Sequence, residues 1–162
     1  MDVNLTVKSI MTREVVSVKP ETPLQEAAEI LAKRGFDGMP VVDEESKLVG
    51  ILTEYDLISK GSATHLPTFQ KIIQNLGVYS KDKSQFTKDF EEISSLKVKD
   101  VMNKDPLTLF EDATYEEAVQ AFRDHHRVNP IPVIDNDRKV IGVISRFDVL
   151  KPLHLVDKQV LS

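Results

Sequence analysis

Two stretches of this sequence follow one pattern: GILTEYDL at residues 50–57 and GVISRFDV at residues 142–149. Each contains a glycine, two apolar residues, a serine or threonine, two variable residues, an aspartate and an apolar residue. The apolar residues are typical of a buried strand. A hydroxyl residue followed three positions later by a carboxylate is typical of a helix start. Each stretch therefore predicts a strand that leads directly into a helix.

This strand-to-helix motif has two chemical interpretations. Free backbone N–H groups at a helix start attract anions, and the hydroxyls of Thr53 and Ser145 can donate to a phosphate or a sugar. The carboxylates of Asp56 and Asp148 lie on the same first turn and can accept hydrogen bonds from a ribose diol, as the acidic residue of a dinucleotide fold does. The alternative is a capping box that only satisfies the donors of the helix. One isolated copy favours the cap, whereas two copies in the same context shift the weight towards ligand binding.

The motif belongs to a longer internal repeat. Residues 7–58 align with residues 98–150 once a one-residue insertion is allowed. Apolar, turn and acidic positions all stay in register, which indicates two copies of one unit. The identical pairs are Val7/Val98, Lys8/Lys99, Met11/Met102, Glu26/Glu117, Ala27/Ala118, Pro40/Pro132, Val41/Val133, Asp43/Asp135, Lys47/Lys139, Gly50/Gly142 and Asp56/Asp148.

Each unit predicts the element order β-α-β-β-α. Runs rich in β-branched residues, one of them opening on a proline, predict the strands. We expect them at residues 15–18, 39–43 and 47–53 in the first copy, and at 107–110, 131–135 and 139–145 in the second. A short helix follows the last strand of each copy, from Thr53 and from Ser145.

The longer helix of each unit has an apolar stripe. In the first copy Thr22 is the expected cap, Pro23 the first helical residue and Gly35 the stop. In the second copy either Asp112 or Thr114 can serve as the cap. The stripes are Leu24, Ala27, Ala28 and Leu31, and Tyr115, Ala118, Val119 and Phe122.

A unit of roughly 50 residues buries too little surface to be stable alone. We therefore expect an α+β fold in which two β-α-β-β-α repeats pack sheet to sheet about a pseudo-twofold axis. The predicted boundaries are 1–60 for the first repeat, 61–97 for a helical insertion, 98–151 for the second repeat and 152–162 for a C-terminal tail. Apolar residues at helical spacing in the insertion predict two packed helices; a gate over a cleft or a partner surface is the alternative.

The set of motifs resembles the CBS domain, first described in cystathionine beta-synthase. The Val-x-x-x-Met start, the hydrophobic-Pro-Val-hydrophobic-Asp strand and the Gly-x-x-Ser/Thr-x-x-Asp segment match in both copies, over residues 7–60 and 98–150. The resemblance implies a tandem pair, or Bateman module, with two clefts between its repeats. It also implies a homodimer that binds AMP, ADP, ATP, S-adenosylmethionine or another adenosyl compound without turning it over, in a regulatory role such as energy sensing. It implies no required cofactor.

The resemblance also implies ligand contacts at matched positions. The hydroxyl residues would touch phosphate or ribose, the aspartates would bind the ribose, and apolar residues on the strands would flank the base. An arginine beside Ser145 can pair with phosphate, whereas Glu54 in the other copy repels it. We therefore expect the cleft of the second copy to favour a phosphorylated ligand; a solvated surface charge is the alternative for this arginine. The implied contacts are Thr53, Asp56, Ser145, Arg146, Asp148, Val16, Leu107, Met39 and Ile131.

Composition excludes several other kinds of protein. The 162 residues carry a net charge of −5, which argues against a nucleic-acid binder. There is no cysteine, so disulfides, thiolate metal sites and a cysteine nucleophile are excluded. No apolar run approaches the length of about 18 residues that a membrane span needs, and no secretory signal is visible at the start. We expect a cytoplasmic protein with no membrane contact.

An enzyme and a ligand-free module are the competing interpretations. His125 and His126 point in helical directions about 100° apart and do not converge on a metal. No catalytic constellation is visible, so we expect no catalytic residue and no metal. A ligand-free dimerisation or protein-interaction module is the main alternative, and an unidentified effector protein is a possible partner of either kind of module. Clefts that are open and polar at Asp56 and Asp148 would favour ligand binding, whereas clefts plugged by apolar side chains would favour the interaction module.

Overall fold

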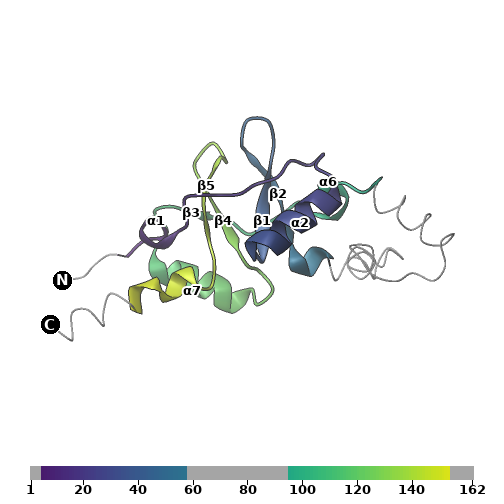
Figure 1. The fold of residues 1–162 in the computed structure, drawn as a ribbon. Helices are drawn as coiled ribbons and strands as arrows, with labels where there is room; N and C mark the ends of the chain where they lie inside the picture. Colours follow the sequence, from purple (N-terminus) through teal and green to yellow (C-terminus); the bar gives the residue numbers. More distant parts are fainter. Residues whose placement is uncertain (1–4, 58–94, 154–162) are drawn as a thin grey trace, which may run out of the picture.

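The computed structural model describes residues 5–57 and 95–153, here named the first and the second half (Figure 1). The first half contains α1 (Val7–Ile10), α2 (Leu24–Arg34), β1 (Gly38–Val42), β2 (Leu48–Thr53) and a helical turn at residues 54–57. The second contains α6 (Val98–Val101), β3 (Leu109–Phe110), α7 (Tyr115–Asp124), β4 (Ile131–Ile134), β5 (Val140–Ile144) and the 3-10 turn η1 (Asp148–Leu150). The insertion predicted at 61–97 and the tail predicted at 152–162 lie almost entirely outside the described residues.

The ends of the longer helices follow the local sequence. Helix α2 ends at Gly35, whose φ of 64° is in the left-handed region that glycine tolerates best. Its N-cap is Pro23, one residue later than predicted, because the Thr22 hydroxyl accepts a bond from the Lys19 amide instead of capping the helix. In the second half Thr114, not Asp112, caps α7 through a reciprocal capping box with Glu117.

Each half is built on an antiparallel strand pair in the same register. Met39 faces Leu52 across β1 and β2, and Ile131 and Ile144, at the matching repeat positions, face each other across β4 and β5. Strand β3 adds to β4 in parallel. In the first half the run predicted as a strand at 15–18 joins the sheet only at Val18, which bridges Val41. The expected α+β pair of repeats is otherwise confirmed.

The opening segment of each half packs in the core of the other half. Val7, Ile10 and Met11 lie in one core with residues of α7, β4 and β5. Reciprocally, the start of the second half, from Val98 to Met102, lies in a core built on α2, β1 and β2. Figure 1 shows α1 beside the second sheet and α6 beside α2. Neither half therefore has a complete core of its own.

Each opening segment crosses a strand of the other half at a glycine. Thr12 exchanges backbone hydrogen bonds of 2.8 and 2.9 Å with Val143, and Asn103 exchanges two of 2.9 Å with Ile51. A Cβ atom added at Gly50 would lie 2.7 Å from the Met102 sulfur and 2.8 Å from the Asn103 carbonyl oxygen. The repeated methionine of one half thus packs on the repeated glycine of the other, because a strand can be crossed this closely only at a residue that has no side chain.

The hairpin turns of the two sheets also meet. The Leu48 amide donates to the Arg138 carbonyl at 2.9 Å, and the Val140 amide donates to the Ser46 carbonyl at 3.2 Å. Together with the two glycine crossings, these bonds join the two sheets, and the halves are related by the expected pseudo-twofold axis. Among the described residues no helix is both long and apolar enough to cross a membrane.

The Gly50 crossing yields a stability prediction. Gly50→Ala should lower the free energy of unfolding by about 1–3 kcal/mol, because the new methyl group meets a backbone oxygen that cannot rotate away. Gly142→Ala should cost less, because its closest contact at 2.6 Å is the flexible Met11 side chain and the Thr12 carbonyl oxygen lies at 3.1 Å. Urea unfolding of both variants measures the difference. An unchanged unfolding midpoint for Gly50→Ala would show that the crossing is not tight.

An ion-pair cluster holds the loop before α2 to the start of the second half. The Glu21 carboxylate binds the Lys97 ammonium and, at 2.5 Å, the Lys99 ammonium. Hydrogen bonds from Lys97 and then Lys99 lower the pKa of Glu21 from 4.5 to about 2. All three side chains are near the surface, so salt should weaken the cluster.

The lowered pKa sets a pH dependence. Because the folded-state pKa lies below the unfolded one, the contribution of Glu21 is fully present above pH 4.5 and is lost as the pH falls through about 2. Wild type should therefore be more stable than Glu21→Gln at neutral pH and low salt, with the difference shrinking in acid and in 1 M salt. Chemical unfolding of both proteins across pH tests this. A difference that is independent of pH would contradict an ionic role.

Candidate functional site

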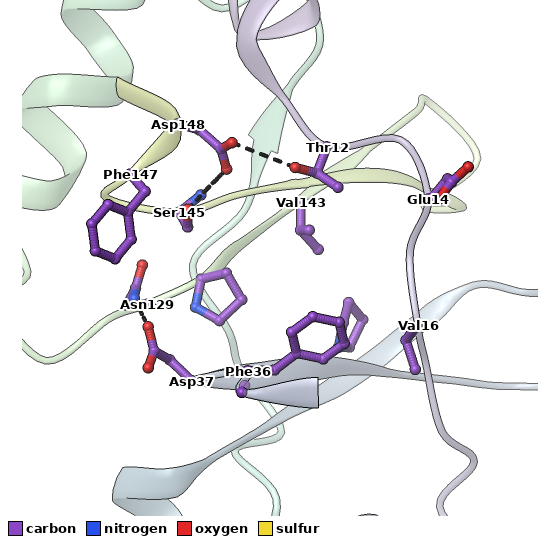
Figure 2. Close-up of a pocket in the computed structure, with 14 residues that line it drawn as sticks. Thr12, Glu14, Val16, Phe36, Asp37, Asn129, Val143, Ser145, Phe147 and Asp148 are labelled. Atoms are coloured by element: carbon purple, nitrogen blue, oxygen red, sulfur yellow. Dashed lines mark hydrogen bonds between the residues drawn. The ribbon is translucent and has the colours of Figure 1, made fainter. Parts of the chain in front are cut away.

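Two clefts lie on the seam between the halves. The first, named the Asp148 cleft, has a volume of about 250 Å³. Figure 2 shows Thr12, Ser145 and Asp148 on one side of it and Phe36 and Asp37 on the other. Both halves thus supply its walls. It is lined by Thr12, Glu14, Val16, Gly35, Phe36, Asp37, Gly38, Pro40, Asn129, Pro130, Val143, Ser145, Phe147 and Asp148.

The second cleft repeats this construction with the halves reversed. This Asp56 cleft has a volume of about 190 Å³. Thr53 and Asp56 come from the first half, and Leu107 comes from the second in the place that Val16 has in the other cleft. It is lined by Ile51, Thr53, Tyr55, Asp56, Asn103, Pro106, Leu107, Arg127, Val128, Asn129 and Pro130.

The two clefts share a wall. Asn129 and Pro130 line both of them. The Asn129 amide group donates to the Asp37 carboxylate at 2.6 Å, and its oxygen accepts from the Arg146 backbone N–H at 3.1 Å. Asn129 therefore connects the loop before β1, the loop before β4 and the motif that follows β5.

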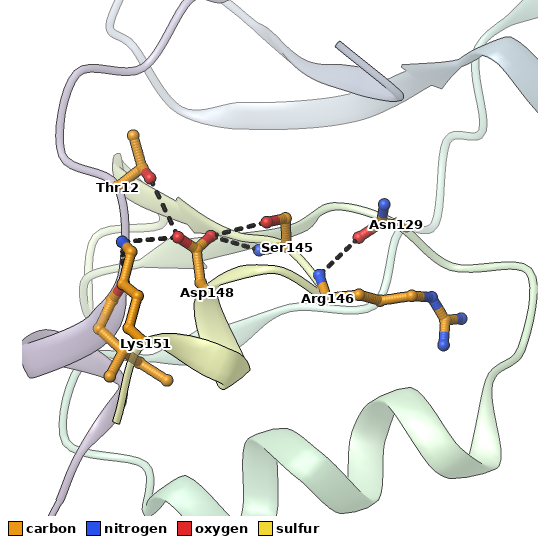
Figure 3. A network of polar contacts seen from close by, with 7 residues as sticks. Thr12, Asn129, Ser145, Arg146, Asp148 and Lys151 are labelled. Atoms are coloured by element: carbon orange, nitrogen blue, oxygen red, sulfur yellow. Dashed lines mark hydrogen bonds and ion pairs between the residues drawn. The ribbon is translucent and has the colours of Figure 1, made fainter. Parts of the chain in front are cut away.

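The carboxylate of Asp148 is buried and fully engaged, with only 5% of the residue exposed. Its Oδ2 accepts from the backbone N–H of Ser145 at 2.7 Å and from the Ser145 hydroxyl at 3.0 Å (Figure 3). Its Oδ1 accepts from the Thr12 hydroxyl at 3.4 Å and pairs with the Lys151 ammonium at 2.6 Å. These contacts compensate the cost of burying a charge.

Asp56 makes the equivalent cap in the first half. Its Oδ2 accepts from the Thr53 backbone N–H at 3.1 Å and from the Thr53 hydroxyl at 2.8 Å. The Thr53 hydroxyl in turn accepts from the Asp56 N–H at 3.2 Å. The capping box is therefore complete in the first half. In the second half the Asp148 N–H donates to the Ser145 carbonyl instead of to its hydroxyl, and only the bonds to the carboxylate are kept. The same residues also line the clefts, so capping and ligand binding do not exclude each other.

The charges on the two clefts differ. Arg127 lines the Asp56 cleft, donates to the Tyr55 hydroxyl at 2.8 Å and lies 5.3 Å from the centre of its ring. The Asp148 cleft has carboxylates at Glu14 and Asp37 besides Asp148, and no basic side chain among the described residues that line it. No group of three or more potential metal ligands occurs in the described part of the chain.

The apolar contacts predicted for the base divide into two groups. Val16 and Leu107 line the clefts. Met39 and Ile131 do not, because their side chains are buried in the two cores with 1% and 0% exposure. Successive strand residues face opposite sides of a sheet, so the core takes Met39 while its neighbour Pro40 reaches the Asp148 cleft.

The guanidinium of Arg146 lies outside both clefts in this structure. Figure 3 shows its guanidinium pointing away from Asp148. It donates to the His126 carbonyl at 2.6 Å and lies 5.3 Å from the centre of the Phe122 ring, in a separate hollow outside both clefts. Arg146 therefore braces the loop that carries Arg127.

Sequence reasoning missed Arg127, Glu14, Asp37 and Asn129 as cleft residues. The basic run that ends at Arg127 was visible in the sequence, but its cleft was not. The sequence does not show that the loop before β4, which carries Arg127, faces Thr53 and Asp56 of the first half, or that the loop before β1, which carries Asp37, faces Ser145 and Asp148 of the second.

Comparison with known proteins agrees with this architecture. A family model described as the CBS domain matches residues 7–62 and 98–155. Inosine-5'-monophosphate dehydrogenase of Methanocaldococcus jannaschii is 32% identical over 142 residues, which cover 88% of this chain and 22% of that protein. The chloroplastic CBS domain-containing protein CBSX1 of Arabidopsis thaliana is 30% identical over 153 residues, which cover 90% of this chain and 63% of that protein. The chain thus spans less than two thirds of each of these two relatives.

Solved structures show the same fold. CBSX2 of Arabidopsis thaliana, in complex with AMP, has a TM-score of 0.70 at 27% identity, and the match covers 94% of this chain and 99% of that one. The CBS domain pair of MJ0100, in complex with 5-methylthioadenosine and S-adenosylmethionine, has a TM-score of 0.65 at 23% identity over 92% and 95% of the two chains. With both repeats matched by the family model and the pair matched by these structures, this chain belongs to the CBS-domain family as a tandem CBS pair.

Proposed function

We propose that this chain is a regulatory module that binds an adenine nucleotide or a related adenosyl ligand in its clefts and does not turn it over. The observation that carries the proposal is the composition of the clefts. Each combines a hydroxyl and a carboxylate from the motif of one half with an apolar residue from the other half: Ser145 and Asp148 with Val16, and Thr53 and Asp56 with Leu107. A nucleoside needs this combination, because its base is flat and apolar and its ribose is a diol.

The hydrogen bonds of Asp148 indicate how a ribose enters. The bond from Thr12 is long, at 3.4 Å, whereas the bonds from Ser145 and Lys151 are at most 3.0 Å. A ribose hydroxyl that replaces Thr12 on Oδ1 exchanges a weak bond for a stronger one and leaves the cap intact. The volumes of about 250 and 190 Å³ suit a small ligand better than an extended one.

Clefts that are open and have a carboxylate in their lining favour ligand binding over a ligand-free interaction module. Asp56 and Asp148 line the clefts, and no side chain of residues 5–57 or 95–153 fills either of them. The solved relative CBSX2 carries AMP, which supports an adenosyl ligand here.

A ligand bound on the seam would act through the relative placement of the halves. It contacts both halves at once, and it can shift their arrangement only by its differential affinity for the two arrangements. The same proposal includes an effector protein that responds to this shift, a homodimeric assembly and a cytoplasmic location. The exposed Leu150 and Leu153, at 48% and 61%, support a self-association surface.

A thermal-shift screen tests the proposed function. AMP, ADP, ATP and S-adenosylmethionine are compared with GTP, and a ligand at about 100 times its dissociation constant adds about 2.7 kcal/mol of stability. We expect at least one adenosyl compound, but not GTP, to raise the melting temperature. The double variant Asp56→Asn/Asp148→Asn should lose the ligand-induced shift, because an NH2 group replaces one acceptor oxygen of each carboxylate and cannot accept a bond from a ribose hydroxyl. The remaining amide oxygen can still accept the bonds of the cap, and the side chain keeps its shape.

The matched control is Asp137→Asn, an exposed aspartate in the turn between β4 and β5. It should keep the full ligand-induced shift. If no adenosyl compound stabilises the wild type, or if the double variant responds like the wild type, the proposed site is wrong and the interaction module becomes the better interpretation.

A further inference from the structure

The Asp148 cleft has an excess of negative charge. Lys151 pairs with Asp148 and offsets its charge, but Glu14 and Asp37 remain. The bond that Asp37 receives from Asn129 comes from a neutral amide and does not cancel its charge. Within the described residues neither carboxylate has an ion-pair partner, so a phosphate that enters this cleft is repelled by both and a cation is attracted.

An aromatic side chain adds to this preference. Phe147 lines the Asp148 cleft at the position where Tyr55 lines the other cleft, and it is 78% exposed. The face of an aromatic ring attracts cations. In the Asp56 cleft this place is already taken, because Arg127 lies against the Tyr55 ring. No described basic side chain that lines the Asp148 cleft competes for Phe147.

The Asp56 cleft has the opposite character. Among the described residues the Arg127 guanidinium donates to the Tyr55 hydroxyl, and its other N–H donors can serve a ligand. A guanidinium is well suited to bind phosphate through two parallel bonds. Tyr55 and the loop brace from Arg146 both hold the Arg127 region in place.

We propose that the two clefts are sorted by charge. The Asp56 cleft takes a phosphorylated adenosyl compound through Arg127, and the Asp148 cleft takes a cationic or uncharged adenosyl compound beside Glu14, Asp37 and Phe147. This inference rests on the proposed function and adds the ligand class of each cleft. It reverses the expectation that the second copy of the motif serves the phosphorylated ligand, because the arginine on which that expectation depended points elsewhere.

Isothermal titration of the full chain with three probes tests this sorting. AMP is anionic, S-adenosylmethionine carries a sulfonium cation, and 5-methylthioadenosine is its uncharged relative. Asp56→Asn should lower the affinity for AMP and leave the affinity for the other two probes unchanged. Asp148→Asn should lower the affinity for the other two probes and leave the affinity for AMP unchanged. Arg127→Gln should lower the affinity for AMP about tenfold or more, which is the loss typical of a charge-assisted hydrogen bond.

The acidic pair has its own variant. Glu14→Gln/Asp37→Asn should lower the affinity for S-adenosylmethionine about tenfold, because two attractive charges near a cation are removed. It should leave 5-methylthioadenosine unchanged, which separates a charge effect from a loss of shape. Arg123→Gln and Glu116→Gln, exposed on α7 and outside both clefts, are the matched controls and should bind all three probes as the wild type does.

The result that overturns the sorting is distinct from failure of the proposed function. If Asp56→Asn and Asp148→Asn each weaken AMP and S-adenosylmethionine to the same extent, adenosyl binding stands and the sorting is wrong. It is also wrong if the acidic-pair variant binds S-adenosylmethionine as tightly as the wild type. If none of the three probes binds the wild type, the proposed function fails and the sorting fails with it.

Discussion

The rest of the structure depends on the close crossing of each opening segment over a strand of the opposite half. Gly50 and Gly142 admit Met102 and Met11 so closely that a methyl group would collide with them. The methionines then complete the core of the half they enter. Because the residues that follow them, Thr12 and Asn103, run along the cleft walls, the same crossing that completes the cores also builds the binding sites.

The motif at each strand-to-helix junction serves stability and binding with the same atoms. Buried carboxylates are costly unless hydrogen bonds compensate them, and here the cap supplies these bonds. Asp56 and Asp148 are 7% and 5% exposed and still line the clefts. Part of the binding geometry is thus held before any ligand arrives, which reduces the ordering cost of binding.

The sequence was informative where local chemistry decides the structure. It predicted the motif strands, the glycine stop at Gly35 and the pairing of the hydroxyl and carboxylate residues, because helix caps and strand patterns are short-range. It did not predict that Met39 faces the core or that Arg146 turns away, since the side that each faces depends on packing. The crossing of the halves was equally hidden, because the repeat shows which positions match but not which of them touch.

A crystal structure of the protein grown with saturating AMP tests the central claim most directly. The account predicts AMP on the seam, with its ribose within hydrogen-bond distance of the motif carboxylate of one half and its base against the apolar cleft residue of the other. AMP bound only outside the two clefts, or clefts that hold only water while solution measurements show AMP bound, would contradict it.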